Sequence, residues 1–390
     1  MIRILPPVAG LLLLFSLFGH AASPDWQAIK QQASGQTVWF NAWGGDTAVN
    51  RYLDHVSREM KRHYNITLNI VHIADAADSV KRITAEAASG RRHSGGSVDL
   101  LWVNGENFYT LKRQGLLFEG WAEQLPDWQY VDTRLPVRED FTHATDGAES
   151  PWGSAMLMFI ARQSAAHPGD PAQLLAAARA LPGKYSYPRP PDFTGTAFIE
   201  QLLSVLTLDP QALRQPPDAA SFDRVTAPLW AYLDQLHPLL WRGGKDFPAT
   251  PGQMDRMFAR GALAMSMTFN PAHARHLVLS KQLPEDSQVF GFRAGMIGNV
   301  HFVAIPQNAT AKAAARVVAN YLLSPQAQAE KADPGVWGDP SVLDVQRVPA
   351  PWRERLITHM PAPAVNVLPE PDAGWVNALE QEWLRRYGTR

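Results

Sequence analysis

The sequence predicts an α/β fold, in which helices cover a largely parallel β-sheet. Strand-like and helix-like segments alternate three times within roughly the first 100 residues after the N-terminal apolar run. One strand-like segment, residues 98–104 (VDLLWVN), is a continuous apolar run, as is typical of a parallel strand buried on both faces. The first helix-like segment repeats its apolar residues at the spacing of one helical face.

The first three strand–helix units follow from these patterns. The expected strands are residues 37–43, 65–73 and 98–104. The expected helices are residues 46–64, 75–89 and 105–115, and Asp78 is the expected cap of the second one. In a parallel sheet, ligands bind beside the carboxyl ends of the strands. The turns NAWGGD and NGEN both fall at that edge, which makes them candidates for ligand contact.

The rest of the chain predicts a further set of elements. Residues 151–163 are expected to form an extended crossing segment and then a buried strand. Further strands are expected at residues 184–188, 262–269 and 295–309, the last as a pair or as one bent strand. Further helices are expected at residues 171–183, 194–208, 227–244, 250–261, 310–332 and 375–387.

Composition excludes several classes of function. The chain has 390 residues, no cysteine and a formal net charge of −1. The absence of cysteine rules out thiol catalysis and thiolate metal sites, and the balanced charge argues against a nucleic-acid partner. The 13 tryptophans are more than a core of this size usually needs, so we expect some of them to line a cleft.

The N-terminus has the pattern of a secretory signal peptide. Arg3 precedes an apolar run from Val8 to Phe18, and small residues follow, which suits cleavage after Ala21 or Ala22. The run is shorter than the roughly 20 residues of a membrane span. Removing residues 1–21 leaves 390 − 21 = 369 residues, enough for two domains. We therefore expect an exported, soluble protein.

Several motifs carry a resemblance to a known family. They are the Trp-Gly-Gly turn, VDLLWVNGENFYTLKRQGLL, RGALAMSMTFNP and FVAIPQNATAKAAARVVANYLLSPQAQ. Together with the signal peptide, they resemble the extracellular solute-binding proteins of bacterial ABC importers. Within that family the chain is most similar to the YnjB-type group, which is related to binding proteins for polyamines, thiamine and sugars. The resemblance covers essentially the whole mature chain.

This resemblance implies both a fold and a function. The fold is a two-lobed, type II clamp of the periplasmic-binding-protein kind, with an interlobe ligand cleft. The first lobe comprises residues 24–153 plus 300–330, and the second residues 154–299 plus 331–390, with crossings at residues 151–155 and 298–303. The function is capture of a small polar organic solute in the periplasm and its delivery to an ABC permease in the inner membrane. We expect a monomer without cofactor.

The turns at the expected cleft supply the candidate ligand-binding residues. In the first lobe these are Asn41, Trp43, Gly44, Gly45, Asp46, Asn104, Glu106 and Asn107. At the crossings and in the second lobe they are Trp152, Phe193, Thr194, Gly195, Phe269, Asn270 and Asn299. Aromatic rings beside Asp46 and Glu106 would suit an organic cation, such as thiamine or a polyamine, through cation–π contacts and a carboxylate. The same residues would stack equally well on a sugar.

Some candidates have a second interpretation. Asp46 and Asn107 could instead cap their helices, and Trp152 could pack at the hinge. His273 and His276 have a spacing that could share a metal, but no third ligand is evident and a solvated helix start is preferred. The alternative function is a secreted α/β hydrolase, for which no nucleophile–base pair or metal cluster can be assembled. The prediction is therefore a binding protein and not an enzyme.

Overall fold

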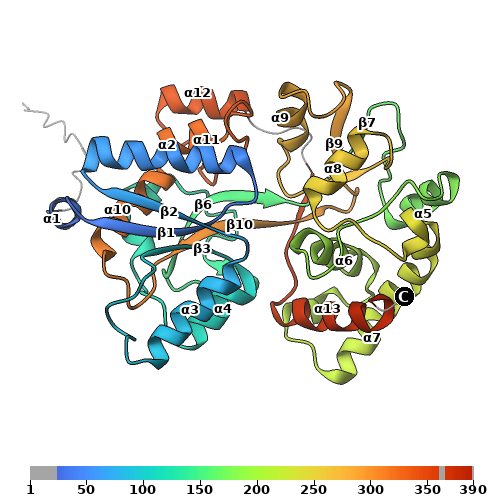
Figure 1. Cartoon of the computed structure of the whole chain (residues 1–390), viewed down its shortest axis with the longest axis horizontal. Helices are drawn as coiled ribbons and strands as arrows, with labels where there is room; N and C mark the ends of the chain where they lie inside the picture. Colours follow the sequence, from blue (N-terminus) through green and yellow to red (C-terminus); the bar gives the residue numbers. More distant parts are fainter. Residues whose placement is uncertain (1–23, 360–364, 389–390) are drawn as a thin grey trace, which may run out of the picture.

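The computed structural model describes residues 24–359 and 365–388, which form two lobes joined by extended chain (Figure 1). The predicted signal peptide lies outside these residues. The first lobe, coloured mainly blue and cyan with the orange segment near the C-terminal end, lies to the left in Figure 1, and the second lies to the right. None of the helices in this part of the chain is both long and apolar enough to span a membrane.

A six-stranded sheet forms the centre of the first lobe. Its strand order is β11-β10-β3-β1-β2, and β6 also pairs with β10. The bounds of the three strands from later in the chain are Glu149–Met156 for β6, Met296–Ala304 for β10 and Val367–Leu368 for β11. The three parallel strands predicted from the sequence are confirmed as β1 (Thr37–Trp43), β2 (Thr67–Ile73) and β3 (Leu100–Val103). Phe40 of β1 is in register with Ile70 of β2 and with Leu100 of β3. All three strands therefore end at the same edge.

Helices cover both faces of this sheet. They are α1 (Pro24–Ala33), α2 (Thr47–Tyr64), α3 (Ala76–Ala88), α4 (Gly105–Arg113), α10 (Lys312–Leu323), α11 (Pro325–Lys331) and α12 (Ala350–His359). The predicted cap Asp78 is wrong, because the carboxylate of Asp75 accepts the hydrogen bond from Ala77 N at 2.7 Å. The single helix predicted at residues 310–332 is divided at Pro325, and Ser324 caps the second part.

The second lobe is built on a small antiparallel sheet. Its order is β8-β7-β9, with β7 (Met158–Arg162), β8 (Ser266–Thr268) and β9 (Ser287–Phe290). Its helices are α5 (Pro171–Ala180), α6 (Phe193–Leu206), α7 (Ala219–Leu236), α8 (Pro251–Ala259), α9 (His273–Leu279) and α13 (Gly374–Tyr387). The strand predicted at residues 184–188 is wrong. Lys184 and Tyr185 accept single backbone bonds from two different segments, Ala264 N and Trp241 N, so no ladder forms.

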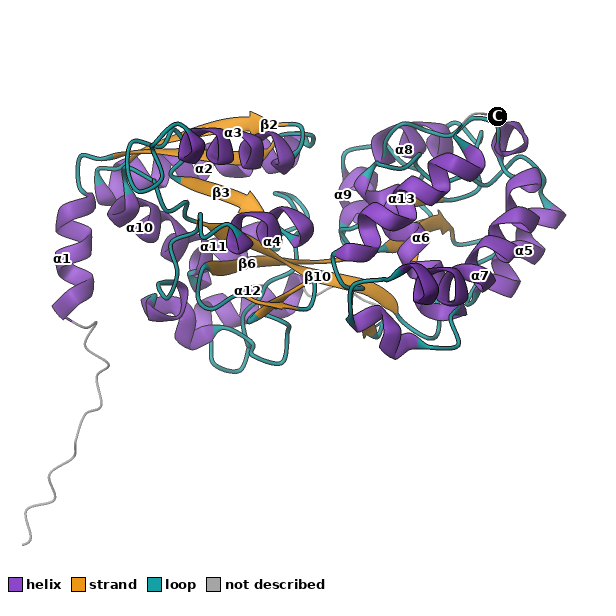
Figure 2. Ribbon diagram, turned by 90° about the horizontal axis from the view of Figure 1, so that it is seen from below, coloured by secondary structure: helices purple, strands orange, loops and turns teal. Residues whose placement is uncertain are grey.

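Two long antiparallel strands connect the lobes. In both views β6 (Glu149–Met156) and β10 (Met296–Ala304) run out of the first lobe toward the second (Figures 1 and 2). The predicted crossings at residues 151–155 and 298–303 fall within these strands. A short strand, β11 (Val367–Leu368), pairs with Met296 and Ile297 on the way to α13. A small hairpin, β4 (Glu139–Asp140) and β5 (His143–Ala144), completes the sheets.

The hydrophobic cores correct the predicted lobe boundary. Trp337, Val342 and Leu356 belong to the same buried cluster as Phe40, so residues 332–356 pack in the first lobe and not in the second as predicted. The buried side chain of Lys331 pairs with Asp339 and holds this segment against β10. The last helix does lie in the second lobe, because its tryptophans share the core of β7.

Candidate functional site

The first predicted turn lies at the end of β1 and shows how its glycines are used. A Cβ on Gly44 would lie 2.7 Å from the Cβ of His72, and one on Gly45 would collide with the indole of Trp43. Both positions therefore need glycine for space, and Trp43 folds over the turn. The Trp43 side chain nevertheless keeps 43% of its surface exposed, so it presents an aromatic face beside the turn.

Two polar candidates of this region are engaged within the first lobe. Asp46 is the N-cap of α2, since its carboxylate accepts from Ala48 N at 2.6 Å and from Val49 N at 3.2 Å. Asn41 is buried, and its Nδ2 donates to Ser79 Oγ at 2.8 Å. The capping interpretation of Asp46 is confirmed, and the Asn41 amide is directed into the lobe.

The second turn lies at the start of α4. Asn104 occupies the N-cap position without capping the helix; its Nδ2 donates instead to the carbonyl of Val300 on the crossing strand β10. Asn107 does not cap either, and donates to Glu106 Oε1 at 3.2 Å. Glu106 is partly buried at the boundary between the lobes. This turn therefore joins the first lobe to the connecting strand and presents one carboxylate.

The second-lobe candidates gather at the start of α6 and at the end of β8. The ring centroids of Phe193 and Phe269 are 4.9 Å apart, and Phe193 is 54% exposed. The backbone amides of the candidates Thr194 and Gly195 are already engaged, because the carboxylate of Asp192 accepts from them at 3.0 and 3.1 Å. This end of α6 thus offers aromatic surface in place of backbone donors.

Three further candidates belong to the connections between the lobes. Asn270 of the second lobe donates to the carbonyl of Trp337 in the first at 3.3 Å. Asn299 donates to Glu370 Oε1 at 2.8 Å. Trp152 is fully buried, and its ring centroid lies 4.8 Å from that of Trp102. Trp152 therefore packs in the hinge, as its alternative interpretation held, and does not present a face to a ligand.

The structure brings together acidic residues that sequence reasoning missed. Glu200 lies on α6, Glu370 precedes α13 and Glu380 lies on α13. The carboxyl groups of all three interact electrostatically with that of Glu106 in the first lobe. We call these four residues the interlobe acidic cluster. Both views place α4 and α6 on opposite sides of the lobe boundary. Glu200 is the only charged residue in the apolar sequence FTGTAFIEQLLSVL, a signal that could have identified it.

The charges of this cluster repel one another. Burial, and to a lesser degree the charges of Glu106 and Glu380, raise the pKa of Glu200 to about 8. Burial also raises the pKa of Glu370 well above its usual value, with Glu200 contributing, while the hydrogen bond from Asn299 opposes the shift. The pKa values of Glu106 and Glu380 are raised by burial and by nearby carboxylates. Within the described chain, neither lysine nor arginine contributes to these shifts.

Hydrogen bonds leave part of this cluster unsatisfied. Glu380 accepts from Thr196 Oγ1 at 2.7 Å. Glu200 is only 3% exposed, and its Oε1 has no hydrogen-bond partner among the described residues. A buried polar atom without a partner is costly, and such atoms in native proteins call for an explanation. A bound ligand with a donor group is one explanation.

The lobes also touch through direct polar contacts. Thr142 of the β4–β5 hairpin donates to Asp372 Oδ2 of the second lobe at 2.7 Å, and Arg214 pairs with Glu139 of the hairpin. His273 lies 2.9 Å from Asp255 within the second lobe. Burial alone would lower the pKa of His273, but Asp255, and to a lesser degree Asp46 across the boundary, raise it.

The histidines His273 and His276, whose spacing could suit a metal, do not share a partner. His276 Nδ1 is 2.8 Å from the carbonyl of Pro334, so His276 and His273 have separate partners. Within residues 24–359 and 365–388, no three histidine or acidic side chains converge in a way that could hold a metal.

Comparisons with known proteins agree with this architecture. The profile of the family described as "Bacterial extracellular solute-binding protein" matches residues 56–354. The chain is 66% identical to Protein YnjB of Escherichia coli (strain K12) over 382 residues, which cover 97% of this chain and 98% of that protein. The chain therefore belongs to the bacterial extracellular solute-binding protein family, and the predicted resemblance to the YnjB-type group is confirmed.

Solved structures show the same two-lobed fold at low sequence identity. A putative extracellular solute-binding protein from Bordetella parapertussis matches with a TM-score of 0.65 at 12% identity, covering 90% of this chain and 98% of that one. A putative spermidine/putrescine ABC transporter protein from Listeria monocytogenes matches with a TM-score of 0.62 at 15% identity, covering 90% and 99%. AfuA from Actinobacillus pleuropneumoniae, solved with fructose-6-phosphate, matches with a TM-score of 0.62 at 13% identity, covering 92% and 100%.

These findings define the class of function. The chain is a bacterial extracellular solute-binding protein with a two-lobed α/β fold. Nothing in the comparisons supports the hydrolase alternative.

Proposed function

We propose that this protein binds a small organic cation at the boundary between its lobes and delivers it to an ABC permease. The observation that carries the proposal is the interlobe acidic cluster. Four carboxyl groups from both lobes face one another there without a basic partner among the described residues. A positively charged ligand would relieve their mutual repulsion, because opposite charges at short range favour the ionised carboxylates.

The unsatisfied atom of Glu200 supports the same ligand class. Its Oε1 is buried and unpartnered within the described chain, so an N–H donor of the ligand would complete its hydrogen bonding. A neutral sugar could also donate a hydrogen bond, but it would leave the repulsion between the carboxylates in place. The electrostatics therefore favour the cation over the sugar.

Exposed aromatic rings supply the second element of such a site. Phe193 lies seven residues before Glu200 on α6, two helical turns away, and its ring contacts Phe269. Trp43 lies at the end of β1 in the first lobe and is also exposed. Rings of this kind attract cations through their negative faces, while the carboxylates supply the opposite charge. Thiamine and polyamines are small organic molecules that carry positive charge.

The delivery route follows from the family. We propose that residues 1–21 are removed on export, and that the mature protein acts as a monomer in the periplasm. Ligand binding would hold the lobes together, because contacts to both sides favour the closed arrangement over an open one. The permease in the inner membrane would recognise that arrangement. The site contains no catalytic step and needs no cofactor.

Calorimetric titration of the purified mature protein tests the ligand class. We expect thiamine, putrescine or spermidine to bind and raise the melting temperature, and neutral sugars to do neither. Glu106→Gln should weaken the binding cation at least about tenfold, the scale of a lost charge-assisted hydrogen bond. The matched control is Glu285→Gln, because Glu285 is exposed in a loop of the second lobe. Binding of a neutral sugar alone, or equal affinity of the Glu106 variant, would contradict the proposal.

A further inference from the structure

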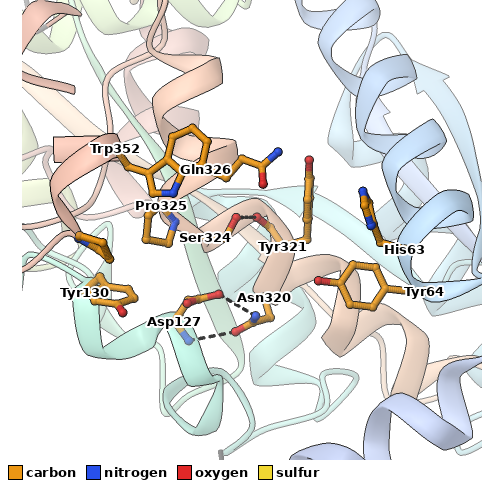
Figure 3. Close-up of a pocket in the computed structure, with 11 residues that line it drawn as sticks. His63, Tyr64, Asp127, Tyr130, Asn320, Tyr321, Ser324, Pro325, Gln326 and Trp352 are labelled. Carbon is orange, nitrogen blue, oxygen red and sulfur yellow. Dashed lines mark hydrogen bonds between the residues drawn. The ribbon is translucent and has the colours of Figure 1, made fainter. Parts of the chain in front are cut away.

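A hollow distinct from the interlobe acidic cluster lies within the first lobe. It has a volume of about 570 Å³ and lies where the end of α2, the 3₁₀ helix Pro126–Tyr130, the end of α10 and the starts of α11 and α12 meet (Figure 3). None of the candidate ligand-binding residues or acidic-cluster residues lines it. The two regions can therefore be tested separately.

Aromatic rings form the walls of this hollow. Figure 3 shows Tyr130 and Trp352 on one side, Tyr64 and Tyr321 on the other, and Asp127 between them. The rings come from four different elements, which the fold of the first lobe brings together. An arrangement of tyrosine and tryptophan around a carboxylate is chemically suited to an ammonium group, which is attracted by ring faces and by negative charge.

Within the described part of the chain, the carboxylate of Asp127 has one side-chain hydrogen-bond partner, the neutral amide of Asn320. Asn320 Nδ2 donates to Asp127 Oδ2 at 2.7 Å, and the backbone N–H of Asp127 donates to Asn320 Oδ1 at 3.0 Å. Burial raises the pKa of Asp127 to about 6, which the bond from Asn320 opposes. Burial raises the pKa of Tyr64, and the nearby charge of Asp127 raises it as well. No ion pair to Asp127 occurs among the described residues, so its charge is not neutralised.

His63, the basic residue that lines this hollow, is paired with a carboxylate outside it. His63 Nε2 lies 3.1 Å from Glu59, and the same carboxylate is 3.0 Å from Arg62. Glu59 is buried and fixes both of these side chains on α2. His63 therefore does not supply a counter-ion to Asp127, and the hollow keeps its negative character.

Tyr321 contributes an unused polar group. Its side chain is only 6% exposed, and its hydroxyl has no hydrogen-bond partner among the described residues. The neighbouring hydroxyl of Ser324 is already engaged, since it donates to the carbonyl of Tyr321 at 2.7 Å. A buried hydroxyl without a partner on the wall of a cavity is a position where a ligand donor would be accepted.

We propose that this hollow is a second binding site, which takes the ammonium group of a small primary amine. The aromatic walls face the alkyl chain and the positive charge, Asp127 accepts one N–H and the Tyr321 hydroxyl accepts another. The proposal does not depend on the interlobe site, because no residue is shared between the two.

Nuclear magnetic resonance of the mature protein, with n-butylammonium chloride as the probe, tests this site. The indole N–H signal of Trp352, assigned with Trp352→Phe, should shift saturably with n-butylammonium. Sodium chloride at the same ionic strength and n-butanol should produce no saturable shift. Asp127→Asn should weaken binding at least about tenfold, as expected for loss of a charged acceptor. Glu106→Gln, in the interlobe cluster, should leave this affinity unchanged.

A second variant guards against a folding defect in Asp127→Asn. Tyr321→Phe removes only an unpartnered hydroxyl, so it should fold normally and still weaken n-butylammonium about threefold or more, the scale of one neutral hydrogen bond. Equal shifts with n-butanol would show a merely apolar hollow and would overturn the proposal. So would unchanged affinity in both variants, or the absence of a saturable shift with the probe in large excess.

Discussion

Two groups of buried ionisable side chains lie near the connection between the lobes, and they are organised in opposite ways. At the hinge, the fully buried amine of Lys331 pairs with Asp339, and His301 Nε2 lies 2.8 Å from the same carboxylate. Burial alone would raise the pKa of Asp339, but Lys331 and His301 hold it below its usual value. In the interlobe acidic cluster, by contrast, the carboxyl groups face other carboxyl groups and neutral donors, and no basic side chain among the described residues contributes to their pKa shifts.

This difference separates an architectural role from a binding role. The hinge group is complete in itself, because each charge has its partner and Trp337 covers the amine at 5.4 Å from the ring centroid. Gly153 is part of this arrangement, since a Cβ there would collide with the Asp339 carboxylate. The acidic cluster is incomplete, because its repulsion has no internal compensation among the described residues. We infer that the hinge group holds residues 332–356 in the first lobe and that the acidic cluster is a site for a bound cation.

The largest expected effect follows from breaking the hinge group. Lys331→Met leaves Asp339 buried beside His301 alone, and breaking a buried ion pair in this way costs about 3–5 kcal/mol. Urea unfolding of the ligand-free protein should show this loss. The double variant Lys331→Met/Asp339→Leu should recover most of the loss, because it removes both charges. Ligand affinity per folded molecule should not change, and a specific loss of affinity would assign the hinge group to binding.

The acidic cluster should respond to pH in a way that the hinge does not. The pKa of Glu200 rises from 4.5 to about 8 on folding. A carboxyl group of this kind stabilises the fold fully at pH values below its unfolded pKa, and the contribution is lost as the pH rises through the folded pKa. The free energy of unfolding of the ligand-free protein should therefore fall between about pH 4.5 and 8.

Glu200→Gln tests whether this residue causes that fall. The amide does not titrate, so the variant should show a flatter profile and should be more stable than the natural protein at pH 8. Glu370 titrates in the same cluster, so part of the slope should remain. Glu285→Gln, on the exposed loop, should reproduce the natural profile. A variant profile identical to the natural one would show that Glu200 does not carry an uncompensated charge.

The sequence predicted the elements of the fold better than the site. The alternation of strand-like and helix-like segments predicts β1, β2 and β3, because the residues that form each strand are consecutive in the sequence. No such pattern shows which lobe a segment joins. The lobe of residues 332–356 is predicted wrongly because it depends on contacts that are distant in sequence, such as the pairing of Asp339 with His301 on β10. The same limit applies to the acidic cluster. Glu106, Glu200 and Glu370 come from separate parts of the chain and meet only after both lobes have formed.

Trp43 gives the smallest of these effects and the sharpest test of where the ligand lies. Its ring is 43% exposed beside the Gly44–Gly45 turn, in the lobe opposite Phe193. If the cation is held between the lobes, Trp43→Ala should weaken calorimetric affinity by at least about 1 kcal/mol, the scale of a lost aromatic contact. The melting temperature of the ligand-free protein should hardly change, because the exposed ring contributes little to the core. A buried tryptophan would instead cost about 3–5 kcal/mol of stability. A large loss of stability with intact affinity would therefore make WFNAWGGD an ordinary connection between strand and helix, and would leave the acidic cluster as the whole of the cation site.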